Sequence, residues 1–388
     1  MTPHDLRVAL FSGNYNYQKD GANTALNRLV AHLLARGVAV RVYSPTTDTP
    51  AFPPTGDLVS VPSVPVPGRP EYRAALGLPA AVRADIRAFA PTLIHVSAPD
   101  FLGHRAVSLA RGLGLPAVAS VHTFWESYFR YYRLGWAVPL GERVLRRFYG
   151  RCVEVYAPSQ AMADLLRAKR LARTIHLWER GVDRTLFHPG RRDLAWRRSL
   201  GVADDELLVA FVGRLVLEKG LDVLAATAAE AARTGLRLRW LVVGDGPARD
   251  WIAERLPTGL FTGFLGGEAL ARAYASADIF LNPSSTETFG QVTTEAMASG
   301  LPVVGARAGG TQSLVEDGAS GFLVPPDDAV ATAAALARLA SDPALRAAAG
   351  ARGLALSQRF DWDTVNQVVL DRYLAVASAA HARSRCAA

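Results

Sequence analysis

The sequence predicts two consecutive doubly wound α/β domains, and three observations support this. The 388 residues, half of them hydrophobic and 20% charged, are enough to fill two hydrophobic cores. Apolar segments alternate with helix-like segments along the chain, which is typical of parallel sheets covered by helices. The alternation is broken near residue 180 by "ERGVDRTLFHPGRRDLAWRRSLG", which we interpret as a connection between domains.

The first half of the chain begins with the apolar run "LRVALFSG" at residues 6–13, and a helical pattern follows it. The runs "VAVRVYSP", "LIHVSAP", "PAVASVHT" and "VEVYAPS" repeat this order of strand and helix. The proline-dense stretch 44–70 interrupts it, and we expect an exposed excursion there with at most one short strand. Residues 1–180 are therefore assigned to the first domain.

The second half repeats the pattern with the strand-like runs "LLVAFVG", "LRWLVVGDGP", "ADIFLNPS" and "LPVVGARAGG". The helix-like segment "GLDVLAATAAEAAR" follows the first of these runs. Residues 181–360 are therefore assigned to a second domain of similar size. Residues 361–388 begin an amphipathic pattern, "DWDTVNQVVLDRYLAVASAAHA", and we expect a terminal helix that packs back toward the first domain.

Composition narrows the possible classes of protein. The two cysteines, Cys152 and Cys386, lie far apart in sequence, which argues against a disulfide framework or a zinc cluster. No window approaches the roughly 18 to 20 apolar residues of a membrane span, and the N-terminus lacks a signal pattern, so we expect a cytoplasmic protein. Residues 1–190 carry 23 Lys and Arg against 13 Asp and Glu, a net charge of +10. This half could attract nucleic acid, anionic lipid or a phosphorylated small molecule.

The loop "GRLVLEKG" follows the first strand of the second domain and carries Arg214 and Lys219. In open α/β sheets, ligands bind beyond the carboxyl ends of the strands. A helix begins at the end of this loop, where backbone N–H groups favour an anion. Lysine is also rare, with three in the chain. The loop predicts a phosphate clamp, and two surface charges at a domain edge are the alternative.

The segment "SSTETFGQVTTEAMASG" places Glu287 on a loop after a strand and Glu295 inside the next helix. Eight residues span about 12 Å along a helix, which is more than the roughly 5 to 9.5 Å between paired glycosidase carboxylates. An acid/base couple acting on one bond is therefore disfavoured. Between the two acids lie the amides of Phe289, Gly290 and Gln291. We interpret the stretch as a nucleotide-sugar site, in which each glutamate contacts hydroxyl groups and the amides between them contact phosphate. Two solvated glutamates are the alternative.

Taken in order, "GVDRTLFHP", "GRLVLEKG", "VVGDGP" and "FTGFLGGEALARAYASADIFLNPSSTETFGQVTTEAMASGLPVVGARAGG" resemble the family 4 retaining glycosyltransferases. Their GT-B architecture has two Rossmann-like domains that face an interdomain cleft. The resemblance implies an N-terminal acceptor domain and a C-terminal nucleotide-sugar donor domain. It also implies that Arg214 and Lys219 bind the donor diphosphate, that Glu295 holds the ribose and that Glu287 contacts the transferred sugar. Neither a cofactor nor a metal ion is then expected.

The first half of the chain fits the same family more loosely. "GNYNYQKDGANTALNRL" is similar to its glycine-containing first loop, with Gly21 at the helix start, and a flexible surface loop is the alternative. "SVHTFWESYFRYY" resembles the segment whose histidine lies beside the reacting sugar, which implies that role for His122. A structural histidine is the alternative. The segment departs from many relatives at Phe124, Trp125 and Glu126, which leaves the identity of the acceptor open.

Residues 128–151 contain six arginines interleaved with seven aromatic residues. Such a segment can lie on an anionic membrane surface, and a helix that packs its aromatic side on the first sheet is the alternative. The basic first half favours an enzyme bound peripherally to the inner face of the cytoplasmic membrane. The closest resemblance, to glycolipid-forming mannosyl-, glucuronosyl- and sulfoquinovosyltransferases, points the same way.

Other readings of the sequence are weaker. Asp361 and Asp363 form a DxD pattern, but they begin a helix, where Asp is a capping residue. An NAD-dependent enzyme would need G-x-G-x-x-G after the first strand, and "SGNYNYQKDG" does not supply it. No nucleic-acid-binding module is recognised. A GT-B sugar-nucleotide epimerase, or a transferase that extends a polysaccharide or lipopolysaccharide, stays an alternative.

The sequence thus predicts a retaining hexosyltransferase. Its expected donor is GDP-mannose or a UDP-hexose such as UDP-glucuronate. Its expected acceptor is a membrane lipid such as diacylglycerol, ceramide or phosphatidylinositol.

Overall fold

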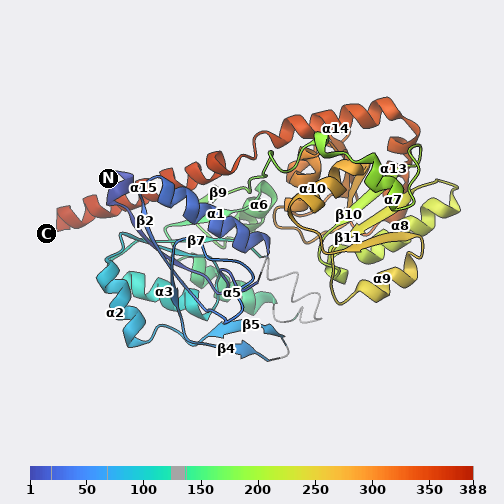
Figure 1. The fold of residues 1–388 in the computed structure, drawn as a ribbon. Helices are drawn as coiled ribbons and strands as arrows, with labels where there is room; N and C mark the ends of the chain where they lie inside the picture. Colours follow the sequence, from blue (N-terminus) through green and yellow to red (C-terminus); the bar gives the residue numbers. More distant parts are fainter. Residues whose placement is uncertain (19, 68, 124–135, 137, 388) are drawn as a thin grey trace. The chain divides into compact units, whose positions relative to one another are not determined.

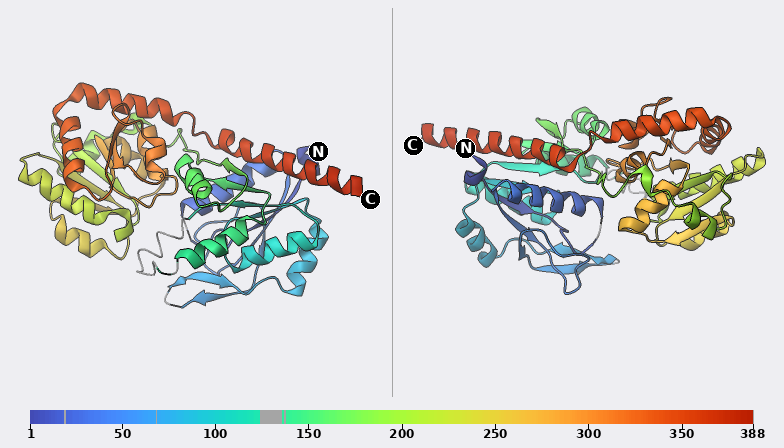
Figure 2. Two further views of the ribbon diagram at one scale, coloured as in Figure 1. Left: turned by 180° about the vertical axis from the view of Figure 1, so that it is seen from behind. Right: turned by 45° about the horizontal axis from the view of Figure 1, so that its top comes forward.

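The computed structural model describes residues 1–388 with the exception of 19, 68, 124–135, 137 and 388. The chain divides into two compact units. Unit 1 comprises Met1–Arg180 together with Trp362–Ala388, and unit 2 comprises Gly181–Asp361. In each unit, helices lie against a parallel sheet (Figure 1 and Figure 2).

The main sheet of unit 1 has seven parallel strands in the order β3-β2-β1-β6-β7-β8-β9. The strands are β1 (Arg7–Phe11), β2 (Ala39–Ser44), β3 (Asp57–Ser60), β6 (Leu93–Val96), β7 (Ala117–Ser120), β8 (Glu154–Ala157) and β9 (Ile175–Leu177). Every residue of β6, β7 and β8 is buried, as expected for parallel strands covered on both faces.

Helices cover both faces of this sheet. They are α1 (Gly21–Ala35), α2 (Ala80–Phe89), α3 (Phe101–Gly112), α5 (Val138–Tyr149), α6 (Gln160–Ala168) and α15 (Trp362–Ala387). Neighbouring residues of β7 point to opposite faces: Ala117 and Ala119 pack with residues of α2, α3 and α6, whereas Val118 packs with residues of α1 and α15. The pattern of alternating strands and helices in the sequence is therefore the pattern of a sheet with two hydrophobic cores.

The terminal helix α15 belongs to unit 1 and lies beside α1 (Figure 1). Its buried apolar residues recur at helical spacing and share a hydrophobic cluster with α1; they are Val369, Leu370, Tyr373, Val376 and Ala377. Polar contacts complete the attachment. Asp363 lies 3.2 Å from His32 Nδ1, and Trp178 Nε1 donates to Asn366 Oδ1 at 3.1 Å. The second Asp of the DxD pattern thus contacts a histidine of α1.

The proline-dense stretch 44–70 contains more strand than expected. Besides β3, it includes β4 (Ser63–Val66) and the start of β5 (Arg69–Ala75), which form an antiparallel pair. The prediction of at most one short strand is therefore wrong. In a two-stranded pair each strand has a free edge, so a proline such as Pro65 can turn the position of its missing N–H away from the partner strand.

Unit 2 contains a second parallel sheet, of six strands in the order β12-β11-β10-β13-β14-β15. The strands are β10 (Leu208–Val212), β11 (Arg239–Val243), β12 (Gly259–Gly263), β13 (Ile279–Asn282), β14 (Val303–Ala306) and β15 (Gly321–Val324). The order reverses between β10 and β13, because β10 pairs with both β11 and β13. In doubly wound sheets, the carboxyl ends of strands at such a switch point border the ligand site.

The helices of unit 2 also cover both faces of its sheet. They are α7 (Leu194–Ser199), α8 (Leu221–Arg233), α9 (Arg249–Arg255), α10 (Gly267–Ser276), α11 (Gln291–Ala298), α12 (Thr311–Leu314), α13 (Ala329–Ser341) and α14 (Pro343–Ser357). One hydrophobic cluster joins the sheet to α10, α11 and α12, and the other joins it to α8, α9 and α13. The helix expected near Phe289 or Gly290 begins at Gln291, and Gly300 follows it in the left-handed conformation, as predicted.

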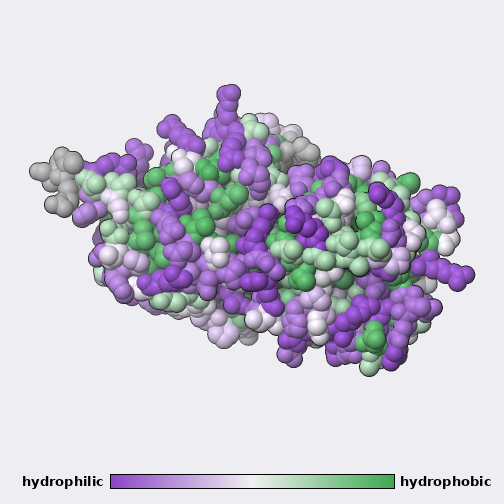
Figure 3. Space-filling model, turned by 90° about the horizontal axis from the view of Figure 1, so that it is seen from above, coloured by the Kyte–Doolittle hydropathy of each residue, from purple (hydrophilic) through white to green (hydrophobic). Residues whose placement is uncertain are grey.

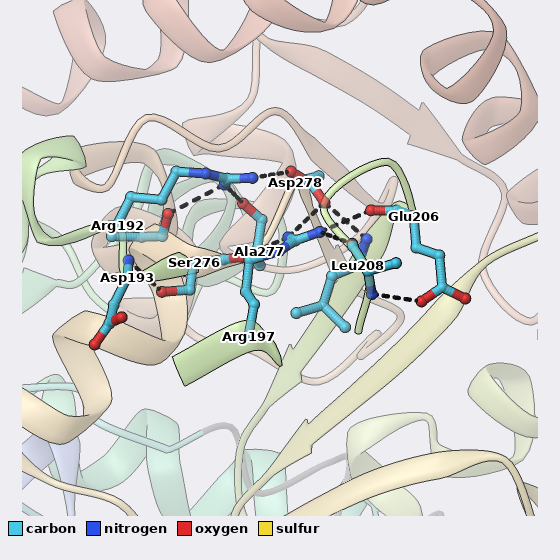
Figure 4. Close-up of polar contacts among 10 residues, drawn as sticks. Arg192, Asp193, Arg197, Glu206, Leu208, Ser276, Ala277 and Asp278 are labelled. Carbon is cyan, nitrogen blue, oxygen red and sulfur yellow. Dashed lines mark hydrogen bonds and ion pairs between the residues drawn. The ribbon is translucent and has the colours of Figure 1, made fainter. Parts of the chain in front are cut away.

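The amino ends of the central strands of unit 2 are fixed by a buried arginine (Figure 4). Arg197 of α7 is fully buried and donates to Asp278 Oδ2 at 2.9 Å and to the Glu206 carbonyl at 2.7 Å. The same Asp278 oxygen accepts the amide of Leu208 at 2.8 Å. This network joins the segment after residue 180 to the starts of β10 and β13, and it is therefore separate from their carboxyl ends.

On the face drawn in Figure 3, hydrophilic and hydrophobic side chains are interspersed. No helix in the described part of the chain is long and apolar enough to cross a membrane.

Candidate functional site

The Arg214 and Lys219 loop leaves the carboxyl end of β10 and contacts the loop after β13. Gly220 adopts the left-handed conformation, with φ of 75°, and a Cβ there would lie 2.9 Å from the carbonyl of Pro283. The Thr286 hydroxyl donates to the carbonyl of Glu218 at 3.1 Å. The glycine and this hydrogen bond hold the two predicted motifs side by side.

The two motifs also meet through their charged side chains. Lys219 Nζ donates to Glu287 Oε1 at 2.6 Å, and the Glu287 side chain is 15% exposed. Arg214 is exposed, and its guanidinium has no ion-pair partner among the residues that the structure describes. The loop therefore offers one cation that orients the carboxylate of Glu287 and one that can reach a soluble anion.

Two glycines after β14 hold the loop of Glu287 in place. The amide of Gly310 donates to the Glu287 carbonyl at 2.6 Å. A Cβ on Gly310 would overlap the backbone of Phe289, and a Cβ on Gly309 would overlap the carbonyl of Glu287. The sequence analysis did not single out these glycines, although "ARAGG" is part of the segment that carries the family resemblance.

The start of α11 is open to an anion. Gly290 is the N-cap, with φ of 101°, and no side chain caps the helix. Backbone N–H groups at such a helix start lack helical partners and favour negative charge. The Phe289 side chain is buried against Phe360, with 5.7 Å between ring centroids, so this residue can offer a ligand its backbone only.

Glu295 lies within α11, one turn after Gln291. Tyr274 donates its hydroxyl to Glu295 Oε2 at 3.1 Å, and Gln291 Nε2 donates to the carbonyl of Gly181 at 2.9 Å. Burial raises the pKa of the Glu295 carboxyl to about 7, although hydrogen bonds from Tyr274 and Gln291 act to lower it. Glu295 is thus half-buried, ordered by hydrogen bonds and able to titrate near neutral pH.

The end of β13 is tied to the helices on either side of the site. Asn282 Nδ2 donates to the hydroxyls of Thr293 at 2.9 Å and Thr311 at 3.2 Å, and all three side chains are buried. These bonds connect β13, α11 and α12. Unit 2 therefore brings Arg214, Lys219, Glu287 and the start of α11 to one edge of its sheet.

The first predicted position in unit 1, Gly21, is the first residue of α1. Among the described residues, and apart from its chain neighbours and the backbone of α1, no atom would lie within 4 Å of a Cβ there, so the described part of the fold does not require a glycine. Asp20 caps the helix by accepting the amide of Asn23 at 2.8 Å. The capping carboxylate occupies a place that a phosphate could otherwise take, and the role of Gly21 in donor binding stays a prediction.

The second position, His122, follows β7 and belongs to a chain of polar groups. Arg180 Nη2 donates to His122 Nδ1 at 3.2 Å, and His122 Nε2 lies 2.8 Å from the Ser120 hydroxyl. The same hydroxyl lies 2.9 Å from Nε2 of His95, whose Nδ1 lies 2.6 Å from the hydroxyl of Tyr373. The chain thus runs from α15 through the sheet to its carboxyl edge.

These contacts determine the tautomer of His122. Arginine can only donate, so Nδ1 of His122 is the unprotonated nitrogen and Nε2 carries the hydrogen. Burial and the nearby Arg180 cation hold the pKa of His122 well below its usual range. His122 is therefore neutral with both ring nitrogens engaged, and it could take up a proton only after losing the Arg180 bond.

Among the described residues, no group of three or more His, Cys, Asp or Glu is placed to hold a metal ion. Phe124, Trp125 and Glu126 lie outside the described residues, as do 128–135 and 137 of the arginine and aromatic segment. Of that segment's aromatic residues, Phe148 and Tyr149 are buried in the core of unit 1.

Two family models match the chain. Residues 19–186 match the family model described as Glycosyltransferase Family 4, and residues 206–342 match the model described as Glycosyl transferases group 1. The chain belongs to glycosyltransferase family 4 and is a hexosyltransferase.

Curated relatives cover most of the chain. A GDP-mannose-dependent alpha-mannosyltransferase of Mycolicibacterium smegmatis is 38% identical over 83% of this chain and 85% of the relative. One from Corynebacterium glutamicum is 35% identical over 82% of this chain and 76% of the relative. Sulfoquinovosyl transferase SQD2 of Arabidopsis thaliana is 34% identical over 77% of this chain and 60% of the relative.

Solved structures show the same fold. Sucrose-phosphate synthase from Thermosynechococcus elongatus has a TM-score of 0.75 at 23% identity, covering 96% of this chain and all of that one. The glycosyltransferase WaaG, involved in lipopolysaccharide biosynthesis, has a TM-score of 0.70 at 20% identity, covering 94% and 99%. The predicted GT-B fold, with two Rossmann-like domains, is confirmed.

Proposed function

We propose that this enzyme transfers a hexosyl group from a nucleotide-diphosphate sugar to a membrane lipid with retention of configuration. The donor would be GDP-mannose or a UDP-hexose such as UDP-glucuronate. The observation that carries the proposal is the Lys219–Glu287 contact, at 2.6 Å, beside the open start of α11. The relative named as a GDP-mannose-dependent alpha-mannosyltransferase supports a nucleotide-sugar donor, and the one named as a sulfoquinovosyl transferase supports transfer of a hexose-type group.

Each part of the unit 2 site has a proposed role. Arg214, Lys219 and the amides at the start of α11 would stabilise the negative charge that develops on the departing diphosphate, which is the main catalytic contribution. Glu287, held by Lys219, would accept hydrogen bonds from hydroxyl groups of the transferred sugar. Glu295 would accept hydrogen bonds from the hydroxyl groups of the ribose. No metal ion is needed in this scheme, because the two cations and the helix start supply the positive field.

Retention is proposed to proceed by substitution on the front face of the sugar. The acceptor oxygen would bond to the anomeric carbon while the bond to the diphosphate breaks, and the leaving phosphate oxygen would take the acceptor's proton. His122 is neutral with both ring nitrogens engaged, which supports a mechanism in which His122 does not accept this proton.

The test is a donor panel. The purified enzyme is incubated with membrane lipid extract and one of GDP-mannose, UDP-glucose, UDP-galactose or UDP-glucuronate, with and without a chelator. We expect one donor to give a glycolipid whose mass increment identifies the sugar, with an α anomeric proton by NMR and no effect of the chelator. Transfer only to an added saccharide, or isomerised donor without any transfer, would refute the lipid acceptor.

The surface of α5 supports the membrane part of the proposal. Leu140 is 61% exposed and Val144 is 44% exposed, four residues apart on one side of the helix. Arg143 and Arg147 are exposed next to them. An exposed strip of apolar and basic side chains fits an anionic interface, where the apolar groups enter the headgroup region and the guanidinium groups contact phosphates.

Replacing both arginines by glutamine, Arg143→Gln with Arg147→Gln, should weaken binding to phosphatidylglycerol vesicles. The expected loss is about 2 kcal/mol, or roughly 30-fold, since each basic residue near an anionic surface contributes about 1 kcal/mol. Vesicle co-sedimentation measures the effect. The matched control is Arg83→Gln with Arg87→Gln, two exposed arginines with the same spacing on α2. Equal losses in the two double variants would mean that net charge alone drives binding.

A further inference from the structure

Tyr274 of α10 is fully buried, and its position is fixed by aromatic packing. Its ring makes an edge contact with Phe187 at 5.8 Å and a tilted contact with Phe280 at 5.7 Å between centroids. The first of these rings lies in the segment before α7, and the second belongs to β13. A ring held from two sides places its hydroxyl oxygen at a defined point, and that point is 3.1 Å from Glu295 Oε2.

A phenylalanine would fill the same apolar space, so the packing does not explain the hydroxyl. A buried tyrosine hydroxyl needs a hydrogen-bond partner, and the partner here is a carboxylate proposed to bind ligand. Within the described residues, Glu295 has no Lys, Arg or His in ion-pair contact. The neutral donors Tyr274 and Gln291 are therefore what stabilises its negative charge.

We propose that Tyr274 is a positioning residue for the nucleotide donor: its hydroxyl holds the Glu295 carboxylate ionised and oriented to accept the ribose hydroxyls. This inference rests on the proposed function. Tyr274 and Gln291 each donate to the Glu295 carboxylate, and a carboxylate with about four acceptor sites can still accept hydrogen bonds from a ligand. The contact joins α10 to α11, so the orientation of Glu295 depends on a residue 21 positions earlier in the chain.

The arrangement makes donor binding depend on pH. Ribose hydroxyls donate stronger hydrogen bonds to a carboxylate than to a protonated carboxyl group, so binding favours ionised Glu295. With a pKa of about 7, Glu295 is ionised above neutral pH, and donor affinity should rise from pH 6 to pH 8 and then level off. Loss of the Tyr274 hydrogen bond removes stabilisation of the anion, which raises the pKa further and moves this rise to higher pH.

Charged groups on the neighbouring elements are engaged elsewhere. Their contacts are Lys219 with Glu287, Arg272 of α10 with Asp193, Glu268 of α10 with Arg191, Arg352 of α14 with Glu316, and Arg346 of α14 with the carbonyl of Leu339. Glu287 is the charged group that also influences Tyr274.

The experiment measures binding of GDP, UDP and the sugar nucleotide that the wild type uses, by calorimetry from pH 6 to pH 9 in two buffers of different ionisation enthalpy. We expect Tyr274→Phe to weaken binding at pH 7 by roughly tenfold, the scale of one hydrogen bond to a charged group. Proton release on binding should fall through half of its maximal value near pH 7 in the wild type, and about one pH unit higher in the variant. In steady-state assays, KM for the donor should rise while kcat changes little.

Two variants keep the result interpretable. Tyr43→Phe removes a hydroxyl that donates to a carboxylate, Asp85 Oδ2 at 2.8 Å, but in unit 1, and it should leave the pH profile unchanged. Glu295→Gln should bind weakly and without proton release, and it tests the titrating group even if Tyr274→Phe folds poorly. An unchanged profile in folded Tyr274→Phe overturns the inference. Absence of nucleotide binding in the wild type at every pH would instead refute the proposed function.

Discussion

Replacing Arg214 or Lys219 by alanine should lower kcat for hexosyl transfer by about 10²-fold or more, the scale seen when one preorganised charge stabiliser is removed. Both residues lie on the loop at the carboxyl end of β10, and Lys219 is already fixed against Glu287 before substrate arrives, so this cation needs little reorganisation during the reaction. Lys219→Ala should also raise KM for the donor more than Arg214→Ala does, because it leaves the Glu287 carboxylate without its partner at 2.6 Å. Initial rates at varied donor concentration measure both effects.

The matched control for these variants is Arg233→Ala. Arg233 lies at the end of α8 in the same unit, its side chain is 71% exposed, and it pairs with Glu230 at the surface. Exposed pairs of this kind contribute little to stability, so the control should keep wild-type kinetics. Near wild-type rates in both Arg214→Ala and Lys219→Ala would refute the assignment of the phosphate site.

Local sequence signals predicted much of unit 2. Strand β10 ends where "LLVAFVG" reaches its glycine. Helix α11 lies between Gly290 and Gly300, both with positive φ, which glycine adopts without strain. In open α/β sheets, ligands bind beyond the carboxyl ends of the strands. This rule predicted that Lys219 and Glu287 lie on neighbouring loops. Strands β10 and β13 are parallel neighbours, so their carboxyl ends lie at the same edge of the sheet. The loops that carry Lys219 and Glu287 therefore meet there.

Other features depend on contacts between distant parts of the chain. The close approach of Gly310 to Phe289 and the bond from Tyr274 to Glu295 are set by helix packing, which residue types alone do not reveal. The engagement of both nitrogens of His122 requires Arg180, 58 positions away. The sequence therefore predicted correctly that His122 follows a strand. It could not predict which ring nitrogen carries the hydrogen.

The largest structural effect is expected from Gly310→Ala. Gly310 has an ordinary φ of −68°, so alanine suits the backbone, but its Cβ would lie well under 3.0 Å from the carbonyl group of Phe289. The loop of Glu287 must then move, at a cost of about 3 kcal/mol. A unit of this size should melt roughly 6 to 12 °C lower, and nucleotide affinity should fall at least tenfold because the start of α11 is displaced. Calorimetry measures both quantities.

Gly266→Ala, where the nearest atom would be 3.5 Å away, is the control in the same unit. Equal melting temperatures for the two variants would show that the loop accommodates the methyl group.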